Sequence, residues 1–93
     1  MIKALETPMP NAQFVTTDFG VATYLFSDSR VQLVATQALS PTRVQFVMTP
    51  KAVCDDLANL YFSDRAMVNP RVLHDRARHL KNVLHAVRRG EHP

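Results

Sequence analysis

The last third of the chain has the pattern of one long amphipathic helix. Asn69 can cap a helix with its side chain, and Pro70 suits the first helical position, where its missing N–H removes no hydrogen bond. Gly90 can take the positive φ that ends many helices. Between these signals, apolar residues recur at spacings of four and three: Leu73, Ala77, Leu80, Leu84 and Val87. This spacing predicts one apolar face, through which the helix packs on the rest of the chain.

The basic residues of this predicted helix lie beside its apolar face. At about 100° of rotation per residue they gather on one flank, and this basic stripe consists of Arg71, His74, Arg78, Lys81, His85, Arg88 and Arg89. Residues 70–93 hold six Lys/Arg and two Asp/Glu, whereas residues 1–69 hold five and six, so the net charge of +3 comes from the C-terminal part. Such a stripe can bind a polyanion, or it can simply keep the protein soluble.

Composition narrows the class of protein. A length of 93 residues suits one domain, and a hydrophobic fraction of 46% is typical of globular chains. No apolar run approaches the roughly 20 residues that cross a bilayer, and the N-terminus lacks the pattern of a secretory signal. Cys54 is the single cysteine, so we expect a free thiol in a reducing compartment. These features predict a cytoplasmic protein with no membrane partner.

Turn and cap residues divide the rest of the chain. Thr16-Thr17-Asp18 predicts a helix start, with a hydroxyl cap followed by an acid, and Ser27-Asp28-Ser29 predicts its end. Residues 30–38 and 43–49 alternate apolar and polar side chains across a turn at 39–42, which predicts a β-hairpin. Val31, Leu33 and Ala35 are expected to face inward in the first strand, and Val44, Phe46 and Met48 in the second. Thr49-Pro50 predicts the start of a further helix, which ends near residue 62.

These elements predict the fold class. We expect an α+β protein of order α-β-β-α-α: a short helix, a β-hairpin, then two helices, with the helices packed on one face of the hairpin. Residues 14–90 are expected to form a single domain. Residues 1–13 hold two prolines and no periodicity, and are expected to be a flexible arm. Residues 91–93 are expected to be a tail.

The predicted hairpin suggests an interaction surface. A two-stranded sheet is marginally stable, and its edges expose unpaired amides and carbonyls. Val34 and Val47 are apolar but fall on the outer, polar face of the hairpin, so we take them as candidate interface residues. We therefore expect a homodimer, which would cover both the edges and this face. A different protein partner could instead bind by strand addition at the sheet edge or on the outer face.

Five stretches of the chain form a pattern: Thr17-Asp18 with Ala22 and Leu25, the strand Val44-Gln45-Phe46-Val47, Leu57 with Leu60-Tyr61-Phe62, Ala66 to Arg71, and Leu80-Lys81. This pattern resembles a small domain of unknown function found in bacterial and phage-encoded proteins. The likeness covers about residues 14–88. One departure is Ser27-Asp28-Ser29-Arg30, where the family has a glycine or a short polar turn. The family has no assigned reaction or cofactor, so the resemblance implies a fold and no site residues.

The sequence offers no catalytic, cofactor or metal motif. The four histidines follow each other at spacings of five, six and seven, unlike the i, i+3 or i, i+4 pairs of helical metal sites. Asp55 and Asp56 are neighbours, so on a helix they diverge. Cys54 borders these two acids, which raise the pKa of its thiol and disfavour a nucleophile. With only Gly20 and Gly90 there is no phosphate-binding loop. We therefore do not expect an enzyme.

Two functions stay open from the sequence. The first is a small non-catalytic interaction, structural or regulatory protein, which acts through the hairpin. The alternative is a nucleic-acid-binding protein that uses the basic stripe. Phosphate binding would depend strongly on salt concentration, whereas strand addition would not.

Overall fold

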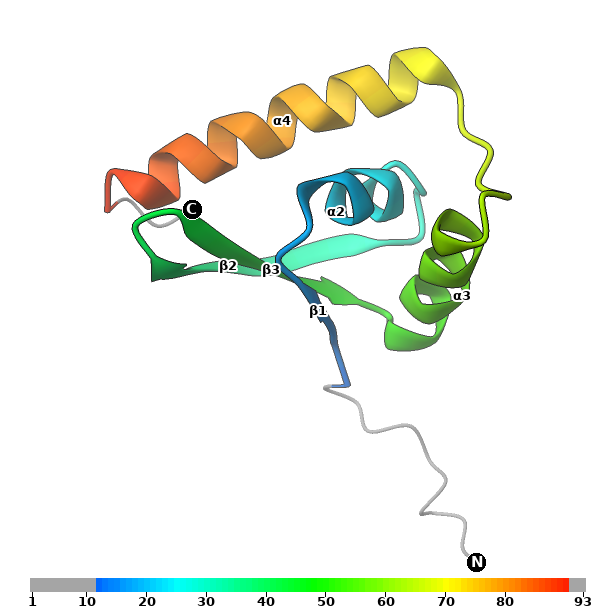
Figure 1. Ribbon diagram of the computed structural model, residues 1–93, viewed down its shortest axis with the longest axis horizontal. Helices are drawn as coiled ribbons and strands as arrows, with labels where there is room; N and C mark the ends of the chain where they lie inside the picture. The colour runs from blue at the N-terminus through cyan, green and yellow to red at the C-terminus, as the bar shows by residue number, and fades with distance from the viewer. Residues whose placement is uncertain (1–11, 91–93) are drawn as a thin grey trace, which may run out of the picture.

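The computed structural model describes residues 12–90, which form a three-stranded antiparallel sheet and three helices (Figure 1). In chain order the elements are β1 (Phe14–Thr16), α2 (Phe19–Phe26), β2 (Gln32–Ser40), β3 (Arg43–Thr49), α3 (Lys51–Phe62) and α4 (Pro70–Arg88). The predicted α+β class is confirmed, but the order is β-α-β-β-α-α because a strand precedes the first helix. Most of the predicted arm, 1–11, and the predicted tail, 91–93, lie outside the described residues.

The strand that the sequence prediction missed changes the sheet. β1 pairs antiparallel with β3, with Phe14 opposite Met48 and Val15 opposite Val47. The strand order β1-β3-β2 makes β3 the central strand, so the predicted two-stranded sheet is wrong. The predicted hydroxyl cap of the first helix is also wrong, because Thr16 belongs to β1. Asp18 caps α2 instead, and its carboxylate accepts a hydrogen bond from the Val21 amide at 3.0 Å.

β3 alternates as predicted, but β2 does not. Val44, Phe46 and Met48 face the core and are 4% exposed or less. Leu33 of β2 pairs with Met48 of β3, and the next paired residue of β2 is Ala35, which pairs with Val47. Val34 is therefore an extra residue in β2, without a partner of its own in β3. This bulge at Val34 reverses the predicted alternation. Ala35 faces outward with Val47, and Thr36 faces inward with Phe46.

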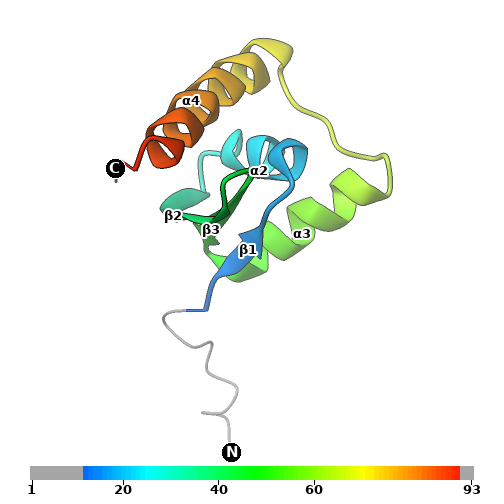
Figure 2. The same ribbon diagram turned by 60° about the vertical axis from the view of Figure 1, so that its left-hand side comes forward.

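The three helices bury the inner face of the sheet. α2 lies between α4 and α3, and α2 and α4 lie over the same side of the sheet (Figures 1 and 2). The core joins Phe46 and Met48 of β3 to Leu25 of α2, Leu57 of α3 and Leu80 of α4. α3 begins at Lys51, one residue later than predicted, and Pro50 is its N-cap.

α4 is the best-predicted element. The Asn69 side chain accepts hydrogen bonds from the Arg71 and Val72 amides, Pro70 begins the helix, and Gly90 takes φ 85° just after its end. Leu80 and Val87 are buried, and the other three residues of the predicted apolar face are half-buried. At 1.5 Å per residue, the 19 residues of the helix span about 28 Å, and α4 contacts both α2 and β2.

Leu80→Ala tests how far the fold depends on the α4 core contact. Because Leu80 is 0% exposed, the substitution should lower the free energy of unfolding by about 2–5 kcal/mol. Val72→Ala on the same helix is the control, and because Val72 is 37% exposed it should cost less than about 1 kcal/mol. Urea denaturation measures both. A loss below about 0.5 kcal/mol for Leu80→Ala would contradict this packing.

Candidate functional site at the free edge of β2

β2 is a long edge strand. It stands at one end of the strand order and pairs only with β3 among the described residues. In an antiparallel strand, every second residue directs its N–H and C=O away from the neighbouring strand, so the other side of β2 presents backbone hydrogen-bonding groups. β2 has nine residues, whereas β1 at the opposite edge has three. The sheet therefore offers one edge that is long enough to pair with a further strand.

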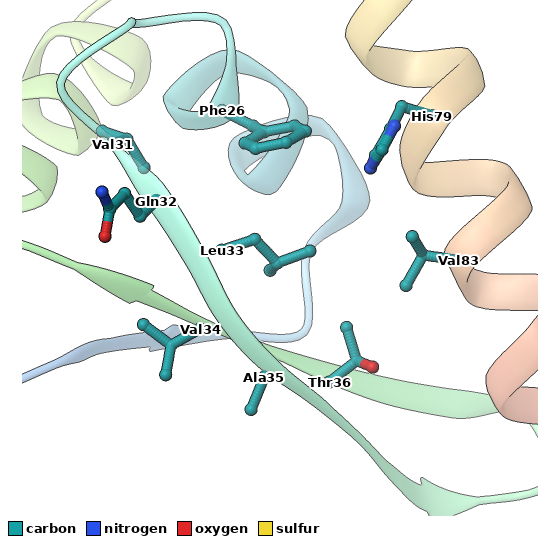
Figure 3. Close-up of a pocket in the computed structure, with 9 residues that line it drawn as sticks. All are labelled: Phe26, Val31, Gln32, Leu33, Val34, Ala35, Thr36, His79 and Val83. Atoms are coloured by element: carbon teal, nitrogen blue, oxygen red, sulfur yellow. The ribbon is translucent and has the colours of Figure 1, made fainter. Parts of the chain in front are cut away.

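A cleft of about 790 Å³ runs along this edge, between β2 and α4 (Figure 3). Its lining residues are Phe26, Val31, Gln32, Leu33, Val34, Ala35, Thr36, His79 and Val83. Leu33 and Thr36 belong to the inner face of the sheet, whereas Ala35 belongs to the outer face. Because consecutive residues of β2 line the cleft, and they belong to both faces of the sheet, the cleft follows the edge of this strand. Figure 3 shows Val34 and Ala35 directed away from α4, and Leu33 directed toward it.

Aromatic and basic groups meet at the cleft, where α4 packs beside Phe26 of α2. The His79 ring is directed into the cleft in Figure 3, and its centroid lies 5.4 Å from that of Phe26. The guanidinium carbon of Arg76 lies 5.0 Å from the centroid of the Phe26 ring, within the range of a cation–π contact. Val83 continues this wall one turn further along the helix. The lining residues include no Asp, Glu, Lys or Arg, and the nearby charge is the Arg76 guanidinium on the Phe26 ring.

Thr36 places a hydroxyl without a partner beside the cleft. Its Oγ1 is buried and has no hydrogen-bond partner among the described residues. A buried hydroxyl that lacks a partner costs about 1–3 kcal/mol. The position results from the bulge, because regular alternation would have put Thr36 on the solvated outer face. Thr36 thus adds a buried hydroxyl to a lining whose other polar side chains are Gln32 and His79.

The two candidate interface residues differ in exposure. Val34 is 50% exposed at the edge of β2, as the sequence predicted. Val47 lies on the outer face, as predicted, but it is only 9% exposed. The physical reason is the third strand: Val47 lies in the central strand, flanked on the outer face by Val15 of β1 and Ala35 of β2.

The basic stripe lies on the opposite flank of α4. All seven of its residues are exposed: Arg71, His74, Arg78, Lys81, His85, Arg88 and Arg89. By helical rotation they are separated from His79 and Val83 by the buried face on one side and by Asp75 and Asn82 on the other. Arg78 lies 3.2 Å from a ring nitrogen of His74, and Arg88 donates to the Thr42 carbonyl at 3.4 Å. The cleft and the stripe are therefore separate surfaces of one helix.

The buried cysteine is poorly suited to nucleophilic chemistry. Cys54 is 0% exposed, and its burial, together with the neighbouring Asp55 charge, raises the pKa of its thiol to about 11. The thiol is therefore protonated at neutral pH, and only a thiolate is a strong nucleophile. Among residues 12–90, no cluster of three or more His, Cys, Asp or Glu side chains has the geometry to hold a metal ion.

Comparisons with models of protein families, with curated proteins and with solved structures found no match to this chain. The resemblance to a bacterial and phage domain stays a prediction. Within residues 12–90, no helix combines the length and the apolar character that crossing a membrane requires. The functional interpretation therefore depends on the cleft and the stripe themselves.

Thr36→Val tests the hydroxyl in the floor of the cleft. The change keeps the side-chain shape and removes the group without a partner, so we expect the free energy of unfolding to rise by about 1 kcal/mol. Thr42→Val in the exposed β2–β3 turn is the control and should change it by less than about 0.5 kcal/mol. Urea denaturation of both variants gives the comparison. A clear loss of stability in Thr36→Val would mean that the hydroxyl already has a hydrogen-bond partner.

Proposed function

We propose that this chain is a non-catalytic interaction protein that binds an extended segment of a partner protein along β2. The observation that carries the proposal is the cleft that follows the free edge of that strand. In strand addition, the backbone groups of an edge strand supply hydrogen bonds, and neighbouring pockets select alternate side chains of the added strand. β2 supplies the edge, and Phe26, Leu33 and Val83 supply apolar walls for those side chains.

A foreign segment fits this edge better than a second copy of the chain. Pairing of two β2 strands would put two α4 helices over the same side of one continuous sheet. Each of these helices carries Arg76 on the side of the cleft, so two like charges would face the new interface. A single extended segment brings no second helix. A second copy of the chain, as in the predicted homodimer, is therefore the alternative to a foreign segment at this edge. The experiment below distinguishes the two.

Val34→Glu and Val15→Glu form a matched pair of variants for this proposal. The two valines are 50% and 48% exposed, but Val34 lines the cleft on β2, whereas Val15 belongs to β1. Nonapeptides selected from a randomised display library on the full chain serve as the probe, with binding measured by fluorescence anisotropy. We expect Val34→Glu to weaken binding at least about tenfold and Val15→Glu to leave it within about twofold.

Two further readouts identify the occupant. Amide hydrogen exchange should show new protection in residues 32–40 when the peptide binds, because its backbone then pairs with β2. A dimer mass in light scattering that Val34→Glu converts to a monomer would identify a second copy as the occupant. Peptides that bind without protecting β2 would overturn the strand-addition proposal.

Nucleic-acid binding by the basic stripe is the second candidate. It is favoured by one observation: none of the Lys or Arg side chains of α4 forms a salt bridge with a carboxylate of another described residue. The stripe from Arg71 to Arg88 covers about 26 Å of helix at 1.5 Å per residue, which is enough to meet several phosphates. Neutralising phosphates releases counterions, so binding of this kind weakens steeply as salt increases.

Charge reversal on either flank of α4 tests this candidate. Arg78→Glu lies in the stripe, and Arg76→Glu makes the same charge change on the cleft side. If the stripe binds nucleic acid, Arg78→Glu should weaken binding to a mixed pool of short DNA and RNA. The slope of the logarithm of the binding constant against the logarithm of the salt concentration should become less steep by about 1 or more. Arg76→Glu should have a smaller effect. Equal effects of both variants would indicate non-specific attraction to net charge.

A further inference from the structure

A second hollow, which we call the helix pocket, lies where the three helices meet. Its volume is about 350 Å³, and it shares no lining residue with the cleft at β2. All three helices and the segment 63–69, which joins α3 to α4, contribute to its walls (Figure 2). The residues used below are Phe19, Gly20, Thr23 and Tyr24 of α2, Tyr61 of α3, Ala66 and Val68 of the joining segment, and Leu73 and Ala77 of α4.

We infer that the helix pocket binds a helix of a partner protein. Apolar side chains of that helix enter the pocket, and its Asp or Glu side chains lie beside His74, Arg78 and Lys81 at the α4 border. This surface is separate from the edge of β2, so the inference does not depend on strand addition.

The lining of the helix pocket is apolar. The hydroxyl of Thr23 donates to the Phe19 carbonyl at 2.8 Å, so it is already engaged. The rings of Tyr24 and Tyr61 lie with their centroids 5.8 Å apart. Gly20 lets Tyr61 lie against α2, because a Cβ at this position would be 2.5 Å from the Tyr61 hydroxyl oxygen. Such a hollow suits apolar side chains.

The apolar surface continues outside the helix pocket. Phe62 is 68% exposed, and its ring centroid lies 5.3 Å from that of Tyr61, which lines the pocket. Met67 is 89% exposed and stands in the chain between Ala66 and Val68, which both line the pocket. Large exposed apolar side chains beside an apolar hollow are typical of a surface that binds another protein.

Exposed basic side chains border the helix pocket on α4. Ala77 lines the pocket, and its neighbours on the helix surface, three and four residues away, are His74 and Lys81. Arg78 extends this border, because its guanidinium lies 3.2 Å from a ring nitrogen of His74. Neither Arg78 nor Lys81 forms a salt bridge with a carboxylate of residues 12–90. Asp75 is rotated about 200° from Ala77, so it lies on the far side of the helix.

The charges on the two walls orient the bound helix. At the α2 wall, an Asp18 carboxylate oxygen lies 3.3 Å from the Cβ position of Gly20 and accepts a hydrogen bond from the Val21 amide. Acidic residues of the partner would be repelled there and attracted at the α4 border. Charge complementarity therefore places them on the α4 side of the apolar side chains.

The walls of the helix pocket favour a helix over an extended segment. None of the described residues that line it belongs to a strand, so it offers no sheet edge. An extended segment would leave part of its backbone unpaired against these apolar walls, whereas a helix satisfies its own backbone groups. Apolar residues at i and i+3 or i+4 share one face of a helix and enter a hollow together, while the flank beside them carries the charges.

A display library of a small three-helix scaffold with randomised helix surfaces, selected on the full chain, supplies the probes. We expect enriched surfaces to combine apolar residues at helical spacing with Asp or Glu on one flank. Val34→Glu should leave their binding unchanged, because Val34 belongs to the cleft at β2. If the enriched surfaces lack acidic residues, or if Val34→Glu abolishes their binding, the inference is wrong, and strand addition is unaffected.

Three variants locate the selected binders, with Kd measured by fluorescence anisotropy. Lys81→Glu reverses the charge at the border, and we expect it to weaken binding at least about tenfold. Arg88→Glu is the control: it gives the stripe an acid at a site about 16 Å along α4 from Ala77, and should change Kd less than about threefold. Ala77→Leu fills the pocket and should weaken binding at least about tenfold. Circular dichroism checks that each variant is folded.

Two results would exclude a partner helix in the helix pocket. Equal losses from Lys81→Glu and Arg88→Glu would mean general attraction to the basic stripe, as expected for a nucleic acid. A dimer mass in light scattering that Ala77→Leu or Lys81→Glu converts to a monomer would identify a second copy of the chain as the occupant. Because Lys81 is exposed, its variant tests the inference even if Ala77→Leu disturbs the fold.

Discussion

Burial of the inner face of β3 is the interaction on which the rest of the structure depends. Val44, Phe46 and Met48 belong to one core cluster with buried residues of all three helices, so the central strand lies at the centre of the core. The same arrangement creates the candidate site. α4 reaches the core through Leu80 and Val87, whereas its neighbouring flank, with His79 and Val83, extends over the edge strand and leaves the cleft open. The packing that stabilises the fold also forms one wall of the surface that we propose for binding.

The sequence predicts the elements whose signals are long and regular. The caps and the apolar face of α4, and the alternation of β3, are all found in the structure. β1 was missed because three residues are too few to show a period of two, and because its strand character comes from pairing with a distant segment. The alternation predicted for β2 fails beyond Leu33 because of the bulge. A bulge depends on how two strands pair, so it cannot be predicted from the residues of one strand alone.

The candidate site was predictable only in part. The exposure of Val34 and of the basic stripe was predicted from the pattern of side chains, because exposure at those positions follows from local periodicity. The cleft could not be predicted from the sequence, because it depends on the position of α4 over β2 and on the bulge that turns Thr36 inward. The low exposure of Val47 was not predictable, because β1, which the sequence does not reveal, pairs with β3 beside it. Helix flanks are local properties, whereas a cleft between two elements is a property of the fold.

The unequal lengths of the two edge strands limit what this sheet can assemble into. β2 offers nine residues for pairing and β1 only three, so the sheet can grow effectively in one direction. Once a strand occupies β2, residues 12–90 retain no second long edge on which another copy can add. Association through this edge therefore ends at a defined stoichiometry, instead of continuing into the open-ended stacking that two long edges permit. A short opposite edge thus makes an exposed binding edge compatible with a discrete complex.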